Sequence, residues 1–197
     1  MPSERLLPLL KEVRSCTQCA AELPLGPRPV LQVSNSARIL IVGQAPGTKV
    51  HATGIPFNDP SGDRLRLWMG IDRDTFYDDS QIALLPMAFC YPGRGRGGDL
   101  PPPPRCAETW RERLLAQLRD VELTIALGQY AVGWHLPDQP GTLSDVVKRW
   151  REIIPKLLPM PHPSPRNNRW LRNNPWFETE VVPWLRTRVQ TVLGRHP

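Results

Sequence analysis

The sequence lacks long apolar segments and has few cysteines, and these absences exclude several classes of protein. No apolar run approaches the ~18 residues of a membrane-spanning helix. The segment from Met1 to Leu10 has no apolar core of the kind found in signal peptides. No internal repeat is visible. We therefore expect a cytoplasmic protein without a membrane partner.

Acidic residues are outnumbered by basic ones. The chain of 197 residues has 19 Asp and Glu against 25 Lys and Arg, a net charge of +6. This balance suits a polyanionic partner such as nucleic acid, although many basic proteins bind none. The length and the hydrophobic content of 40% predict one domain spanning residues 1–197, which we expect to be a monomer.

Short aliphatic runs alternate with helical segments along the chain. The patterns predict strands at 37–42, 82–89, 123–127 and 156–160, and helices at 4–14, 63–71, 106–118, 129–136, 145–154 and 174–193. Ser144 and Asn174 are the expected N-caps of the last two helices. The alternation predicts an α/β fold, a three-layer α/β/α sandwich around a short, mostly parallel four-stranded sheet. Ligands of such sheets bind at the carboxyl ends of the strands, here the loops 43–62, 91–105 and 162–172.

Four cysteines form two pairs. Cys16 and Cys19 are separated by two residues, whereas Cys90 and Cys106 bracket a proline-rich loop. In a reducing compartment, cysteines are more often metal ligands or free thiols than disulfides. Four thiolates suit a structural zinc ion or an iron–sulfur cluster. The alternative is two ordinary buried thiols and a chance CxxC motif.

Three motifs follow one another in a distinctive order. The first strand runs into the turn GQAPG (residues 43–47), the segment FND follows at 57–59, and HPSP stands at 162–165. In this order they resemble the uracil-DNA glycosylase superfamily, over roughly residues 10–195. The cysteine spacing is similar to that of the branch that carries a [4Fe–4S] cluster. The resemblance implies that Cys16, Cys19, Cys90 and Cys106 bind this cluster, with zinc as the alternative.

The resemblance also implies roles for the motif residues. Phe57 would stack on a base flipped out of DNA. The backbone N–H groups of Gly43, Gln44 and Ala45 would face a carbonyl of that base. His162 would stabilise the departing base anion, as a neutral donor or as a cation.

Two positions depart from the family pattern. The best-known members have an aspartate that positions water where this chain has Ala45, so we expect Asp59 to activate the water instead. Its alternative role, with Asp63, is turn formation and helix capping. The usual uracil-reading asparagine is replaced by Pro86, which has no side-chain donor or acceptor. Asn58 is a candidate substitute, and base specificity stays open.

Basic loops are candidates for contact with DNA. The segment from Arg94 to Gly98 is one, and the alternative for it is a solvated loop. The segment from Arg166 to Arg172 is the other. With Ser164 just before it, it offers Arg166, Asn167 and Arg169 for phosphate contacts, and Trp170 or Leu171 as a wedge into the base stack.

These features predict a monofunctional DNA glycosylase that hydrolyses the N-glycosidic bond of a damaged base, uracil above all. No lysine stands in a motif for Schiff-base chemistry. Three alternatives stay open: a non-catalytic binder of damaged or single-stranded DNA, a glycosylase for another deaminated or oxidised base, and a zinc-stabilised α/β protein of unrelated function.

Overall fold

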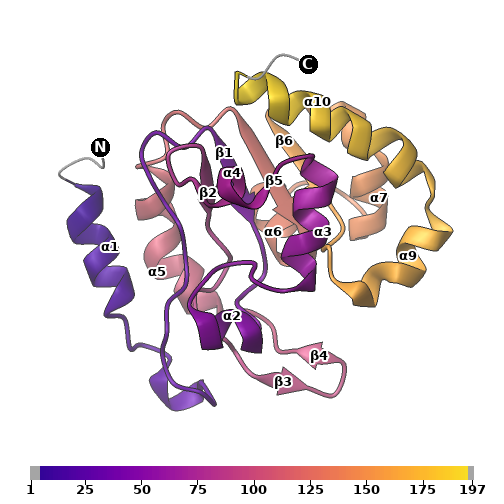
Figure 1. The fold of residues 1–197 in the computed structure, drawn as a ribbon. Helices are drawn as coiled ribbons and strands as arrows, with labels where there is room; N and C mark the ends of the chain where they lie inside the picture. Colours follow the sequence, from indigo (N-terminus) through magenta and orange to yellow (C-terminus); the bar gives the residue numbers. More distant parts are fainter. Residues whose placement is uncertain (1–4, 195–197) are drawn as a thin grey trace.

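A four-stranded parallel sheet forms the centre of the molecule (Figure 1). The structure is a computed structural model that describes residues 5–194. The strands lie in the order β2-β1-β5-β6 and comprise β1 (Ile39–Val42), β2 (Ile82–Leu84), β5 (Leu123–Leu127) and β6 (Leu157–Met160). In register, Ile39 of β1 pairs with Ile82 of β2 and Leu123 of β5. The predicted parallel sheet is confirmed.

Helices cover both faces of the sheet, because side chains on alternate strand positions are buried in two separate cores. Ile39 and Ile41 face a core that includes residues of α3 (Pro60–Met69) and α10 (Val182–Val192). Leu40 and Val42 face a core that includes residues of α1 (Leu6–Arg14) and α5 (Pro104–Leu115). Figure 1 shows α10 beside α3, and α1 beside α5. The three-layer arrangement is therefore confirmed.

The helices are α1 (Leu6–Arg14), α2 (Thr48–Thr53), α3 (Pro60–Met69), α4 (Arg73–Tyr77), α5 (Pro104–Leu115), α6 (Gly128–His135), α7 (Leu143–Lys148), α8 (Trp150–Ile153), α9 (Asn168–Asn173) and α10 (Val182–Val192). Single turns stand at Ala20–Glu22 and Pro165–Asn167, and a π-helical turn at Phe177–Val181 precedes α10. Within residues 5–194, no helix combines the length and apolar character needed to cross a bilayer.

Several element boundaries differ from the sequence prediction for local reasons. The helix expected at 63–71 begins at Pro60, because Asp59 accepts a hydrogen bond from the Gly62 N–H and so caps it. The second strand is short, ending before Pro86, which has no N–H to donate. Thr142, not Ser144, caps α7 through a capping box with Asp145.

The loop expected at 91–105 contains regular structure of its own. The strands β3 (Arg94–Gly95) and β4 (Gly98–Asp99) form an antiparallel hairpin in which Arg94 pairs with Asp99. The hairpin stands apart from the main sheet, below its carboxyl edge in Figure 1. It therefore adds a wall to the region where a ligand is expected.

Candidate active site

A pocket of about 530 Å³, here called the edge pocket, opens at the carboxyl edge of the sheet. The loops after β1, β2 and β6 supply its lining, as the parallel topology predicts. From the candidate residues it gathers Gly43, Gln44, Ala45, Phe57, Asp59, His162, Ser164, Arg166 and Asn167. Asn58 and Arg169 are not among its lining residues.

The turn after β1 presents its backbone to the edge pocket. The Gly43 carbonyl accepts from the Met87 N–H at 2.9 Å, and the Gln44 carbonyl accepts from the Ala88 N–H at 3.0 Å. Among residues 5–194, none accepts a hydrogen bond from the N–H groups of Gln44 and Ala45. The carbonyls of the turn are thus occupied and its amides remain available to a ligand.

Phe57 lies against this turn in a strained conformation. Its φ of 54° is uncommon for a bulky side chain, and such strain often marks a ligand site. A Cβ at Gly43 would approach the Phe57 ring to 3.1 Å, and a Cβ at Gly62 would overlap the Phe57 carbonyl. The edge of Phe76 packs on the ring at 6.0 Å between centroids. Gly43 and Gly62 therefore leave the space that Phe57 occupies, and Phe76 packs against its ring.

His162 also lines the edge pocket, and its ring is a neutral donor. The Ser164 N–H donates to Nδ1 at 3.3 Å, so the ring proton of the neutral form sits on Nε2. Burial lowers the pKa of His162, while the charges of Asp59 and Asp99 act in the opposite direction. At neutral pH the imidazole is therefore uncharged and offers one N–H.

The loop after β6 holds His162 through internal hydrogen bonds. The Asn167 amide donates to the His162 carbonyl at 2.7 Å. Arg64 of α3 donates to the Ser164 carbonyl at 3.2 Å and to the Asn168 side chain at 2.7 Å. Asn167 and Ser164 thus shape the loop from within.

The hypothesis that Trp170 or Leu171 wedges into the base stack is wrong. Leu171 is 8% exposed within the core. The Trp170 ring packs on Trp176, and its Nε1 donates to the Ser144 hydroxyl at 2.7 Å. The helix α9, which lies in a segment expected to be a loop, turns both side chains inward.

The two aspartates near the Pro-Ser-Gly segment have structural partners. Asp59 caps α3 through the 2.9 Å bond from Gly62, and its carboxylate also lines the edge pocket. Asp63 pairs with Arg66 at 2.6 Å. The capping role is therefore confirmed for Asp59 and wrong for Asp63.

Neither the Asn58 side chain nor the Pro86 carbonyl is free to form hydrogen bonds with a base. The Asn58 amide oxygen accepts from Arg73 at 3.0 Å outside the edge pocket. Pro86 lines the pocket, but its carbonyl accepts from the buried Arg111 at 3.2 Å. A ligand would therefore meet an apolar proline ring at this position.

Arg111 and His135 support the wall around Pro86, and sequence patterns did not single out either residue. Arg111 is fully buried, donates to the Leu85 and Pro86 carbonyls, and lies 2.9 Å from Nε2 of His135. Burial, with the Arg111 charge, lowers the pKa of His135 to about 4. His135 is thus neutral at pH 7 and can accept from Arg111.

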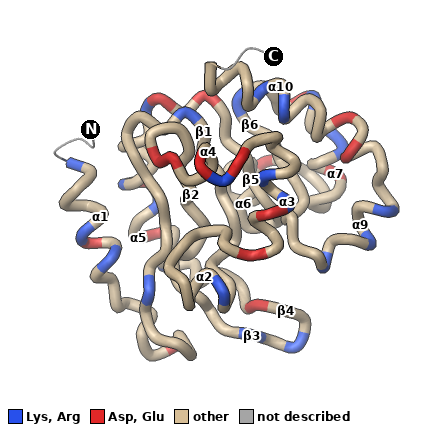
Figure 2. Tube along the Cα trace, in the orientation of Figure 1, with Lys and Arg blue, Asp and Glu red and all other residues tan. Residues whose placement is uncertain are grey.

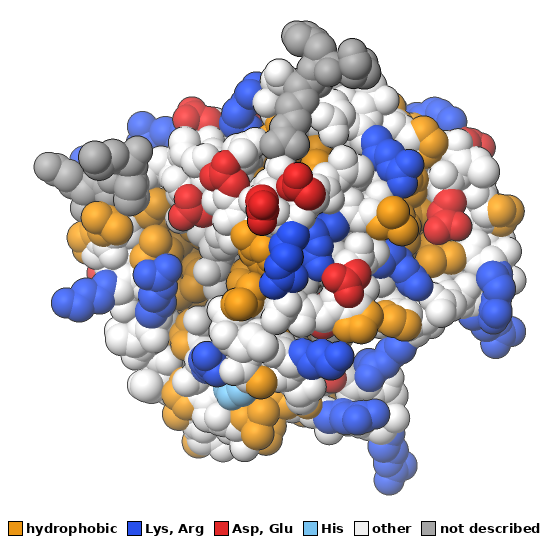
Figure 3. Space-filling model, in the orientation of Figure 1, with side chains coloured by type: hydrophobic (Ala, Val, Ile, Leu, Met, Phe, Trp, Pro, Cys, Tyr) orange, Lys and Arg blue, Asp and Glu red, His pale blue; other side chains and the backbone are white. Residues whose placement is uncertain are grey.

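Positive charge surrounds the mouth of the edge pocket. Lys49, Arg94 and Arg166 contribute to its lining. Figure 2 places Lys and Arg on α2, on the β3–β4 hairpin and on α9. Figure 3 shows such side chains gathered at the lower right of this face, over the hairpin. Arg169 and Arg172 are exposed on α9. An anionic polymer lying across this face would meet basic groups on both sides of the pocket.

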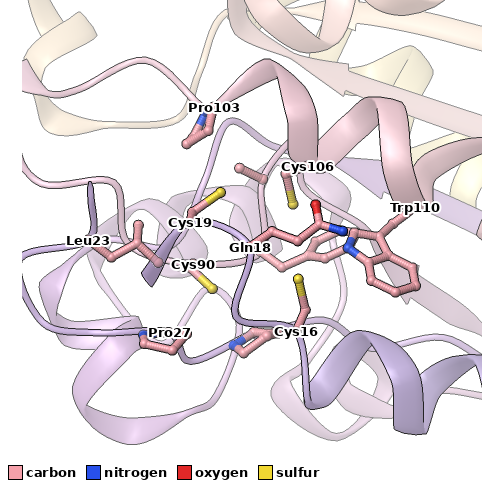
Figure 4. A pocket seen from close by; sticks show the side chains of 12 residues that line it. Cys16, Gln18, Cys19, Leu23, Pro27, Cys90, Pro103, Cys106 and Trp110 are labelled. Atoms are coloured by element: carbon pink, nitrogen blue, oxygen red, sulfur yellow. The ribbon is translucent and has the colours of Figure 1, made fainter. Parts of the chain in front are cut away.

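A second cavity, here called the cysteine pocket, lies between α1, the segment after β2 and α5. Cys16, Cys19, Cys90 and Cys106 all line it, with apolar neighbours such as Leu23 and Trp110 (Figure 4). Its volume is about 20 Å³. Within residues 5–194, no group of three or more His, Cys, Asp or Glu side chains is arranged to hold a metal ion. The structure therefore brings the four thiols to one cavity, and within the described residues it does not arrange them as a closed ligand set.

The surroundings of the thiols oppose their ionisation. Burial raises the pKa of Cys106 to about 12, and the neighbouring cysteines add to the rise. Burial also raises the pKa values of Cys19 and Cys90. The donor set fits a group that brings strong positive charge to four thiolates.

Two comparisons with known proteins concern the family of this chain. The model of the "Uracil DNA glycosylase superfamily" matches residues 31–186. A solved structure described as a "putative Uracil DNA glycosylase" from Methanosarcina acetivorans is 16% identical, covering 79% of this chain and 93% of its own, with a TM-score of 0.46. The matched residues include every part of the edge pocket lining except Val30.

Proposed function

This chain belongs to the uracil DNA glycosylase superfamily, and we propose that it is a DNA glycosylase that hydrolyses the N-glycosidic bond of a damaged base, uracil first among the candidates. One observation carries the proposal: Phe57, His162 and the 43–47 turn line a single pocket of about 530 Å³. That volume lies in the range of small-molecule sites, about 300–1,000 Å³. A flipped nucleotide fits such a site.

Each side of the edge pocket has a chemical task. The Phe57 ring supplies a face for stacking, worth about 1–3 kcal/mol per base. The amides of Gln44 and Ala45 meet a base carbonyl. The Nε2–H of His162 stabilises the negative charge that develops on the leaving base. Lys49, Arg94 and Arg166 hold the phosphates around the flipped nucleotide.

The reaction is hydrolysis. Two carboxylates line the edge pocket, Asp59 and Asp99. The motif order singles out Asp59 as the candidate to activate water, but one of its oxygens already accepts from the Gly62 N–H. Lys49 lines the edge pocket, but it stands in no motif for Schiff-base chemistry, so such a step is not part of the proposal. The product is an abasic strand that stays intact.

We also propose that Cys16, Cys19, Cys90 and Cys106 bind one [4Fe–4S] cluster. Four thiols converge on one apolar cavity, and four cysteine thiolates are the usual ligands of such a cluster. The cluster would join three distant segments of the chain and stabilise the fold. Protein purified without air should be brown, with about four iron and four sulfide per chain, as this cluster type requires. Colourless protein with one zinc per chain would overturn this assignment.

A panel of oligonucleotides tests the proposed activity. Each strand carries one uracil, hypoxanthine or oxidised pyrimidine, single- or double-stranded, and released base is measured directly. We expect uracil release, with strand breakage only after alkali. Breakage without alkali would contradict a monofunctional enzyme, and no release from any strand would overturn the glycosylase proposal.

Ala45 and Pro86 favour a second candidate function. Both line the edge pocket where polar side chains would assist catalysis and reading, so the pocket could bind a flipped base without cutting it. Tight, lesion-dependent binding with no released base would support this function.

A further inference from the structure

The hairpin β3–β4 brings a second carboxylate to the edge pocket. Asp99 lines the pocket together with Asp59, the cap of α3. It is the single acidic residue of the glycine- and arginine-rich loop 91–105. In the sequence, this isolated position is what distinguishes Asp99 from other acidic residues. The basic groups around it would bind phosphates, which an acidic side chain repels. We therefore expect Asp99 to stabilise a positive charge in the pocket.

The hairpin is closed by one internal bond and contacts two other segments, so Asp99 has a defined position. The Gln44 amide donates to the Leu100 carbonyl at 3.1 Å. The Leu100 N–H donates to the Gly93 carbonyl at 2.9 Å. The Arg166 guanidinium covers Gly98, where an added Cβ would collide with it. The turn after β1 and the loop after β6 therefore both hold the strand that carries Asp99.

The Asp99 carboxylate points to the turn that lacks an acid. A Cβ at Gly47 would lie 3.7 Å from its Oδ2, so the carboxylate lies over the end of the turn that contains Ala45. Its charge also reaches His162, whose pKa it raises against the effect of burial. Among residues 5–194, no side chain or backbone N–H is paired with this carboxylate. Asp59, by contrast, is engaged by Gly62.

We propose that Asp99 is the catalytic carboxylate of this enzyme and takes the place of the side chain missing at Ala45. The inference rests on the proposed glycosylase function. The C1′–N bond breaks with its electron pair passing to the base, whose charge His162 stabilises. The water oxygen bonds to C1′, and its proton passes to Asp99 and then to solvent. The base anion takes a proton from solvent. Asp99 also faces the positive charge that develops on the sugar.

Three single substitutions test the assignment, by single-turnover base release and by DNA affinity. Asp99→Asn should lower the rate about 10²–10⁴-fold, the usual contribution of general acid–base catalysis. Its DNA affinity should stay the same or rise, because a negative charge near phosphate is removed. Asp59→Asn keeps the cap, since asparagine caps as well as aspartate, and should lose less than Asp99→Asn. Asp79→Asn, an equal charge change at an exposed site outside the edge pocket, should match the wild type.

The outcomes separate the inference from the function on which it rests. An active wild type whose Asp99→Asn variant keeps its rate within threefold overturns the inference alone. The same holds if Asp59→Asn loses the rate instead, or if Asp99→Asn loses affinity in proportion to rate, which would make Asp99 a support of the hairpin. A wild type that releases no base overturns both.

Discussion

The edge pocket and the cysteine pocket are both lined by the segment 86–90, but they differ in volume, in charge and in the polarity of their lining. Pro86 lines the first, whereas Ala88, Phe89 and Cys90 line the second. The edge pocket is open, charged and about 530 Å³; the cysteine pocket is apolar and about 20 Å³. The bond from the Ala88 N–H to the Gln44 carbonyl joins the two walls. The contrast fits our proposals, in which the edge pocket binds and cuts the nucleotide and the cysteine pocket stabilises the segment that forms part of its wall.

Loss of a cysteine should have the largest effect, on stability. Cys90→Ser should release the metal group and lower the free energy of unfolding by several kcal/mol, out of the roughly 10 kcal/mol that structural metal sites contribute. Iron content and denaturant unfolding measure this. Ala88→Ser, which changes a non-ligand in the same cavity, is the control. A folded Cys90→Ser protein with altered base preference would break the division between the two pockets.

Loss of the His162 donor should affect rate rather than stability. Removing one preorganised donor costs about 3–4 kcal/mol, or about 10²–10³ in single-turnover rate. His162→Ala should reach this loss while still binding uracil-containing strands. His51→Ala, a histidine outside both pockets, should keep the wild-type rate. If His162→Ala is fully active, the leaving-group role moves to the backbone amides of Gln44 and Ala45.

The pH dependence tests the protonation state of His162. Burial lowers the pKa of His162 from its ordinary value of 6.5, so the imidazole takes up its proton at a lower pH than a free histidine does. Protonation puts a second N–H on Nδ1, opposite the Ser164 N–H, and displaces the ring. The rate should thus be level from pH 8 to about 6.5 and should fall only further into the acid range. A fall centred at or above pH 6.5 would contradict the neutral, buried donor.

Loss of the Phe57 ring should be milder. Phe57→Ala should weaken capture of the flipped base by about 1–3 kcal/mol, because stacking acts before and during the chemical step. Phe57→Tyr keeps the aromatic face and should stay near the wild type. Equal affinities of the alanine variant and the wild type for a lesion-bearing strand would mean that the base does not stack there.

Loss of the arginines of the 166–172 segment should give the smallest effect per residue. Replacing Arg166, Arg169 and Arg172 by alanine should lower the log–log salt slope of duplex binding by about 0.9 for each phosphate that is no longer neutralised. Exposed basic residues of the opposite layer, Lys11, Arg14 and Arg119, provide a control of equal charge change. An unchanged slope in the first variant would place the DNA path elsewhere.

Much of the edge pocket could be predicted because its residues follow strand ends. Parallel strands bring their carboxyl ends to one edge, so Gln44 and His162 meet although more than half the chain separates them. The Arg111–His135 pair carries no such signal. Arg111 is buried and donates to backbone carbonyls and to His135, but nothing in the sequence distinguishes it from an arginine on the surface.

The sequence by itself determined the parallel α/β fold, the order of the motifs and the cysteines available as ligands, because periodicity and spacing are local properties. Only the tertiary structure decided which side chains face the edge pocket. Trp170 turns into the core because α9 packs there, and Asn58 is drawn away by Arg73. Asp99 enters because a hairpin in a glycine-rich loop is anchored by Gln44 and Arg166, contacts between segments 50 or more residues apart that no local pattern encodes.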